Sequence, residues 1–367
     1  MQSVAPQIAR RINDRVALDL MLSSGLMTRS GMRAALGMSQ PSTLELFERL
    51  LADGLIEEAG VVAGRRGPRA NGYRVNVRKA LVAVARVAPD ECVAAIADLG
   101  GELLSVVSGG KPTDTHSPSQ HVAQTIRNAV QAAQVDADSV KLTVVATRGV
   151  VDPGTGDVAY VKGHPEWKDA IRSNMEQELE MPVHLENQVK LLGLAELEAV
   201  RPSTPDNFVL ISIGPAGIAS AIVLDGELWR GTNGAAGEIA YLPTGPELPA
   251  LGPGNQVSGG LGNVIGRLRT GRSADFEALT LPVTLAVGAI CSVVDPQMVV
   301  LGGPWGQAGG KKLAESVEAS LASLWPMTVP IQTTRVTGDA VLKGAARAGL
   351  DRLLPDLWGP RTRLTRE

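Results

Sequence analysis

Apolar positions in the first 78 residues recur at spacings that predict three helices followed by a two-stranded hairpin. The first helix is predicted over 13–22, the second from a cap at Thr28 or Ser30 to Leu36, and the third over 40–53. One strand is then predicted to start at Leu55, and a second strand to span 73–77. Ser39 suits the N-cap of the third helix, and Pro41 lies in its first turn, where proline is tolerated. This order of elements is typical of a winged helix-turn-helix domain.

The longer remainder of the chain alternates short apolar runs with amphipathic stretches, a pattern that predicts an α/β fold. Strands are expected at 80–86, 93–97, 103–107, 141–146, 183–186, 208–213, 218–224 and 298–301, and helices at 121–133, 167–178, 189–200, 282–294, 311–323 and near 345–354. Two similar β-rich halves predict a two-lobed, actin-like or hexokinase-like body. We expect a winged helix-turn-helix domain at 1–78, a first lobe at 79–190 that also takes a helix at about 340–355, and a second lobe at 191–339.

Charge is distributed unevenly between these parts, although the 367 residues carry a net charge of only −3. Residues 1–80 hold 12 Lys/Arg against 7 Asp/Glu, a net of +5, and the remainder holds 23 against 31, a net of −8. A basic domain joined to an acidic body favours a polyanion partner, and arginine, whose planar fork suits phosphate, supplies 11 of the 12 basic residues. Double-stranded DNA is the expected partner, and a solvated basic face is the alternative.

In a winged helix-turn-helix, the third helix enters the major groove and an arginine-bearing loop suits the minor groove. The residues predicted to contact DNA are Gln40, Ser42 and Arg49 on the helix and Arg65, Arg66 and Arg69 on the loop. Leu44 and Glu45 argue against this function, because they occupy helix positions that usually present polar or basic groups to the DNA backbone. These two residues leave open the alternative that the N-terminal domain binds a protein instead of DNA.

Several motifs of the body resemble those of the ROK family, whose name joins repressor, open reading frame and kinase. The resemblance covers roughly residues 12–355. The matching stretches are the winged head, Thr147 to Asp152, His184 to Asn187, Ile213 to Ile218, Gly234 to Ile239, and Asp295-Pro296 through Gly302-Gly303. Together they imply a sugar-kinase-like body behind a DNA-binding head.

Two departures from the family pattern imply that kinase activity has been lost. Gln188 stands where the resemblance places the catalytic Asp, and an amide cannot take the proton of a sugar hydroxyl. The family's Asp-x-Gly-Gly-Thr phosphate loop corresponds to residues 85–90, which lack its Asp and its glycines. The stretch 98–101 contains Asp and two glycines, but it follows the second strand and is interpreted as a hairpin turn.

The sugar site of the family is only partly retained. Asn187 and Glu238 match sugar-contacting positions, although they could instead hydrogen-bond the backbone. Tyr241 replaces a family His, while Gln188 and a loop with His164 are expected to border the same cleft. Residues 243–260 contain no Cys, so neither the family's zinc nor any other metal or cofactor is predicted.

These observations favour a DNA-binding transcriptional repressor with a sugar-like effector, acting as a homodimer or homotetramer. A sugar kinase with unusual catalytic groups and a pseudokinase scaffold that binds protein are the alternatives. No apolar run reaches the ~18–20 residues of a membrane span and no signal peptide is recognised, so a cytoplasmic protein without a membrane partner is expected.

Overall fold

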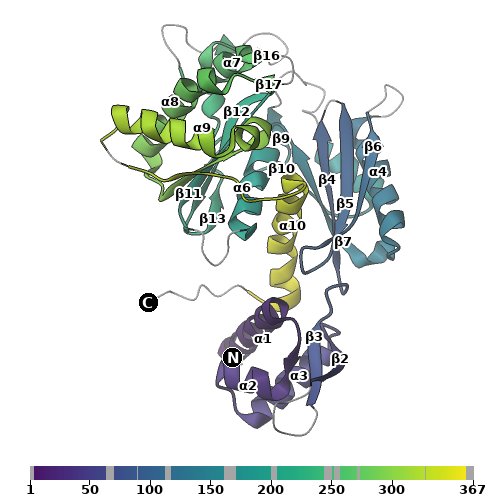
Figure 1. The fold of residues 1–367 in the computed structure, drawn as a ribbon. Coiled ribbons are helices and arrows are strands. Elements are labelled where there is room, and N and C mark those ends of the chain that lie inside the picture. Colours follow the sequence, from purple (N-terminus) through teal and green to yellow (C-terminus); the bar gives the residue numbers. More distant parts are fainter. Residues whose placement is uncertain are drawn as a thin grey trace.

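The computed structural model describes residues 4–62, 70–88, 90–111, 117–160, 171–199, 205–243, 250–251, 257–270, 273–326 and 328–360. Figure 1 shows two α/β lobes side by side, with a small N-terminal head below them. A long C-terminal helix descends between the lobes and reaches the head. The predicted α/β architecture with an N-terminal head is therefore confirmed.

The head is built from three helices and a small antiparallel sheet. Its elements are α1 (Val4–Ser24), β1 (Met27–Thr28), α2 (Arg29–Leu36), α3 (Gln40–Ala52), β2 (Ile56–Val62) and β3 (Ala70–Val75), with strand order β1-β3-β2. Apolar faces of the helices meet the hairpin, where the ring centroids of Phe47 and Tyr73 lie 4.9 Å apart in an edge-to-face contact. This small core fixes α3 against the sheet.

Lobe 1 is a five-stranded sheet in the order β10-β7-β4-β5-β6. Its main elements are β4 (Leu81–Ala88), β5 (Glu91–Ala97), β6 (Leu103–Gly110), α4 (Pro118–Ala133), β7 (Val140–Thr147), β8 (Val150–Val151), β9 (Val158–Tyr160), α5 (Ile171–Leu179) and β10 (Val183–Asn187). The predicted hairpin turn between β5 and β6 is present, because Asp98 Oδ1 accepts hydrogen bonds from the backbone N–H groups of Gly100 and Glu102 at 2.9 and 3.0 Å.

Lobe 2 contains a second five-stranded sheet, in the order β13-β12-β11-β18-β19. Its main elements are α6 (Gln188–Ala199), β11 (Phe208–Gly214), β12 (Gly217–Leu224), β13 (Glu227–Trp229), α7 (Gly260–Arg267), α8 (Phe276–Val294), β18 (Met298–Gly302), α9 (Gly303–Leu324) and β19 (Ile331–Thr333). The short 3-10 turn Ile239–Tyr241 precedes α7. Neither α7 nor β19 is among the elements that the sequence predicts.

The last helix, α10 (Ala340–Trp358), connects the body with the head. It packs on β4, β7 and α6, and Gly344 lies so close to the Leu191 carbonyl that a Cβ would sit 1.9 Å from that oxygen. At its other end, the Arg15 guanidinium of α1 lies 5.4 Å from the Trp358 ring centroid. The helix is longer than the predicted 345–354.

Four other helices are also longer than predicted: α1, α4, α8 and α9. The helix α8 starts at Phe276 and continues through Pro282, and α9 runs from Gly303 with non-helical backbone at Gly310. By length and composition alone, α8 is the one helix among the described residues that could cross a membrane. Its Leu279, Val283 and Val287 are nevertheless fully buried in the core of lobe 2, and core helices of this kind pass the same test.

Candidate functional site

In the head, helices α2 and α3 are joined by a tight turn, and each of the two helices begins with an N-cap residue. Thr28 Oγ1 accepts a hydrogen bond from the Gly31 N–H at 3.1 Å, and Ser39 Oγ accepts one from the Ser42 N–H at 3.3 Å. Gly37 ends α2 with a φ of 63°, a left-handed conformation that favours glycine. These local signals orient α3 relative to α2.

One face of α3 is buried and the other is open to solvent. Gln40, Ser42 and Glu45 are exposed, and Leu44 is 43% exposed. The predicted contacts Gln40 and Ser42 therefore lie on an accessible face near the N-terminus of α3, together with the two residues that argue against DNA. The predicted wing contacts Arg65, Arg66 and Arg69 lie outside the described residues.

Arg49, the third predicted helix contact, has a partner inside the head. Its Nε and Nη2 atoms lie 3.0 and 2.5 Å from the two carboxylate oxygens of Asp14 on α1. The hydrogen bond to Asp14 is the chief cause that raises the pKa of Arg49. This pair holds α3 on α1, and a DNA contact by the same guanidinium stays a prediction.

The Asn187 side chain lies at the end of β10, where it is only 5% exposed. Its amide donates a hydrogen bond to the Gly149 carbonyl at 2.9 Å, and its Oδ1 accepts from the Val189 N–H at 2.8 Å. The side chain thus caps α6 and binds lobe 1 backbone, which is the alternative that the sequence left open. An effector contact by Asn187 stays a prediction.

Lys190, on the first turn of α6, reaches a loop of lobe 2. It is 2% exposed and its Nζ donates to the Gly234 carbonyl. Burial lowers the pKa of Lys190, whereas burial raises the pKa of the half-buried Glu238 and the Lys190 charge opposes that rise. The ammonium and the Glu238 carboxyl therefore form a coupled polar pair at the junction of the lobes.

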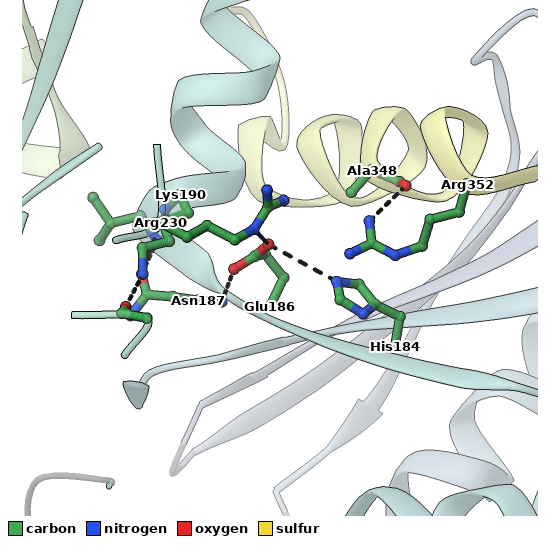
Figure 2. A network of polar contacts seen from close by, with 9 residues as sticks. His184, Glu186, Asn187, Lys190, Arg230, Ala348 and Arg352 are labelled. Atoms are coloured by element: carbon green, nitrogen blue, oxygen red, sulfur yellow. Dashed lines mark hydrogen bonds and ion pairs between the residues drawn. The ribbon is translucent and has the colours of Figure 1, made fainter. Parts of the chain in front are cut away.

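A second polar group surrounds Glu186, which is 2% exposed (Figure 2). The Arg230 Nε atom, which follows β13, lies 2.7 Å from Glu186 Oε2, and His184 Nε2 lies 3.8 Å from the same oxygen. Burial opposes ionisation, but the interaction with His184 and the charge of Arg230 lower the pKa of Glu186 to about 2. The carboxylate therefore stays ionised and joins the two lobes.

Most of the stretch that the resemblance aligns with a phosphate loop belongs to strand β4. Strand β4 pairs with β5 as far as Ala88 opposite Glu91. The Arg86 guanidinium lies 2.6 Å from Asp339 Oδ2 and 2.9 Å from Glu91 Oε2. The Arg86 guanidinium is thus held by two carboxylates, in a stretch that only the family resemblance aligns with a phosphate loop.

Of the three remaining residues predicted to bind an effector, the structure describes two. Gln188 starts α6, directly after Asn187, and Tyr241 lies in the 3-10 turn that Glu238 precedes. His164 lies outside the described residues. Across the described ranges, no group of three or more His, Cys, Asp and Glu side chains could hold a metal ion.

Three residues of these polar groups are not found by reasoning from the sequence. Lys190 follows Asn187 by about one helical turn, and that spacing is a signal that could have found it. Arg230 and Arg352 have no local pattern, because only the packing of distant elements brings Arg230 to Glu186 and Arg352 near them.

Comparison with known proteins covers both the body and the head. Residues 86–257 match the model of the ROK family. The crystal structure of a ROK family transcriptional regulator, a homologue of the Escherichia coli Mlc protein, is similar with a TM-score of 0.72 and 20% identity, over 96% of this chain and 99% of that chain. This likeness establishes the fold of the head and both lobes.

Kinases and repressors both occur among the similar proteins. A ROK family glucokinase from Streptomyces griseus, solved with glucose and AMPPNP, has a TM-score of 0.58 and 18% identity over 73% of this chain and 98% of its own. The xylose repressor of Caldicellulosiruptor bescii is 19% identical over 237 residues, which are 64% of this chain and 59% of the repressor. The match therefore spans less than two thirds of that repressor.

Proposed function

Because this chain carries a ROK family domain, we propose that it is a DNA-binding transcriptional regulator, a repressor, whose kinase-like body binds a sugar-like effector and does not phosphorylate it. The observation that carries the proposal is the capped α2–α3 pair with an exposed α3 face, attached to a ROK body in one chain. Such a protein would act in the cytoplasm on an operator.

The absence of kinase chemistry rests on two positions of the body. Gln188 offers no basic group for a sugar hydroxyl, and the hairpin with Arg86 provides no phosphate loop. Removing a general base costs roughly 10²–10⁴ in rate, and losing phosphate positioning adds to that cost. These losses favour a regulator over an enzyme.

The effector is proposed to bind where the two lobes meet. Glu238 supplies a half-buried carboxyl that can accept sugar hydroxyls, beside the Lys190 ammonium. Gln188 and Tyr241 lie at the ends of neighbouring elements, and an effector that contacts both lobes would shift their relative orientation. Two heads in a homodimer or homotetramer would read half-sites about one helical turn or a multiple apart.

The decisive experiment measures binding of the purified protein to its own promoter region across a salt series. We expect specific binding that weakens as salt rises, because phosphate contacts release counterions. The Arg65→Ala/Arg66→Ala variant should bind more weakly and show a salt slope smaller by about two for each head that binds DNA.

The matched control removes two arginines from the body, with Arg127→Ala/Arg172→Ala, and should leave the slope unchanged. If neither the promoter nor a genomic fragment pool is bound at low salt, the regulator is excluded. Tight, salt-insensitive binding of a protein partner would then favour the scaffold that exposed Leu44 and Glu45 suggest. ATP-dependent sugar phosphorylation that disappears in Glu238→Ala would instead support the kinase.

A further inference from the structure

Two side chains contact one carboxylate at the lobe junction, and an arginine from a third element lies beside them (Figure 2). The three side chains are His184 on β10, Arg230 after β13 and Arg352 on α10, and the carboxylate is Glu186. His184 and Glu186 share one face of the strand, because side chains alternate along it. Leu185, on the opposite face, packs in the core of lobe 1.

The carboxylate is already fully engaged. Glu186 Oε2 accepts from Arg230 at 2.7 Å, and Oε1 accepts from the Asn187 backbone N–H at 3.1 Å. A single negative charge, hydrogen-bonded on both oxygens, therefore faces two arginines. Glu186, Arg230 and Arg352 together leave one positive charge in excess, and the Lys190 ammonium, which also interacts with Glu186, adds another. Burial lowers the pKa of His184, so the imidazole supplies a hydrogen-bond donor rather than a charge.

Two of the surrounding donors have no acid within hydrogen-bond distance among the residues that the structure describes. Arg352 donates to the Ala348 carbonyl of its own helix at 3.2 Å, whereas the neighbouring Asp351 pairs with Arg347. His184 Nε2 is buried without a hydrogen-bond partner. Burial and the charge of Arg230 lower the pKa of Arg352, as expected for two guanidinium groups that lack a shared second anion.

We propose that His184, Arg230 and Arg352 form a binding site for a tetrahedral oxyanion of the phosphate class. A guanidinium presents a planar fork of N–H donors that matches phosphate oxygens, and an imidazole N–H adds a further donor. Arg352 is solvent-exposed, so an anion can reach the site from solution. Glu238, which the proposed sugar-like effector would contact, is not one of the three residues of this site.

A bound oxyanion would connect three parts of the molecule. His184 belongs to lobe 1, Arg230 to lobe 2, and Arg352 to the helix whose far end contacts α1 of the head. Arg11 of α1 also donates to the Pro355 carbonyl of that helix at 3.0 Å. The anion would thereby favour the arrangement in which lobes and α10 are held together.

Isothermal titration calorimetry on the full-length protein without DNA tests the proposal at constant ionic strength. Inorganic phosphate and glycerol 3-phosphate are the two titrants, so that free phosphate and a phosphomonoester are distinguished as sources. We expect saturable binding of at least one of them. Arg352→Gln should weaken it about tenfold, since one charge-assisted interaction is lost, whereas Glu186→Gln should strengthen it because a competing negative charge is removed.

The matched control is Arg335→Gln, another exposed arginine with one side-chain hydrogen bond, to Gln332. It should leave the affinity unchanged, and circular dichroism of each variant establishes that it is folded. The His184 imidazole resonance, assigned with His184→Asn, should shift during the titration. Absence of saturable binding by both anions, or equal affinity of wild type and folded Arg352→Gln, would overturn the proposal. Neither result bears on promoter binding, so the proposed function is tested separately.

Discussion

Arg49 of α3 and Asp14 of α1 form a two-point ion pair, with nitrogen–oxygen distances of 3.0 and 2.5 Å. The two residues are 35 positions apart in sequence, and their ion pair joins two helices of the head. It gives an arginine of the proposed reading helix a structural partner, and this raises the question of whether Arg49 supports α3 or contacts DNA.

The pair predicts similar effects for its two single substitutions. Asp14→Asn and Arg49→Gln should each destabilise the protein by about 1 kcal/mol, because the groups are partly exposed and the pair is partly screened. Urea unfolding followed by circular dichroism measures this cost. If Arg49→Gln weakens promoter binding far more than Asp14→Asn at equal stability, Arg49 contacts DNA directly.

The depressed pKa of Glu186 predicts a loss of stability in acid. Its pKa is about 2 in the folded protein against a usual 4.5, so its contribution is present above about pH 4.5 and is lost as the pH falls towards 2. The contribution amounts to about 1–3 kcal/mol. The urea concentration at the unfolding midpoint should decrease from pH 6 to pH 3.5 by less in Glu186→Gln than in the wild type. Equal decreases in the two proteins would contradict a depressed pKa of Glu186.

Asn187→Ala should destabilise the body by about 2 kcal/mol, because one side chain bonds the Gly149 carbonyl and caps α6. Thermal unfolding measures this cost. The control is Asn128→Ala on α4, an exposed asparagine whose amide oxygen accepts a hydrogen bond from Gln124. A cost no larger than that of Asn128→Ala would leave Asn187 free for an effector role.

Restoring the missing base should not restore a kinase. We expect Gln188→Asp to show no ATP-dependent sugar phosphorylation, because the Arg86 guanidinium and the β4–β5 hairpin still replace a phosphate loop. A coupled ADP-release assay with an active glucokinase as positive control measures this. Turnover that appears with Gln188→Asp would mean that nucleotide can still be positioned in the body.

Helices α6 and α10 pack so closely at Gly344 that a larger side chain there should destabilise the protein. A Cβ at Gly344 would lie 1.9 Å from the Leu191 carbonyl oxygen, so Gly344→Ala should cost about 2 kcal/mol or more. At Gly266 on α7, by contrast, a Cβ would enter open space, and Gly266→Ala should be neutral or stabilising by up to about 1 kcal/mol. Thermal unfolding of the two variants compares them directly, and equal midpoints would contradict the close contact.

Much of the fold could be predicted from local patterns. The start of α3 followed from Ser39 and that of α2 from two candidate caps, Thr28 and Ser30, of which the structure uses Thr28, because an N-cap acts within one helical turn. The turn at Asp98 followed from its position between two apolar strands. By contrast, α7 could not be predicted because its glycines disfavour a helix unless tertiary packing compensates, and here Leu261 and Ile265 are buried in lobe 2.

The sequence by itself determined the order of most helices and strands, the motifs of the body and the presence of Gln188 after Asn187, because each depends on neighbours along the chain. Only the tertiary structure decided that Asn187 is bound to backbone, that Arg49 pairs with Asp14, and that Arg230 pairs with Glu186. Side-chain partners that are tens or hundreds of positions apart leave no periodicity in the sequence. Their charges interact only once folding has brought the elements together and removed the intervening water.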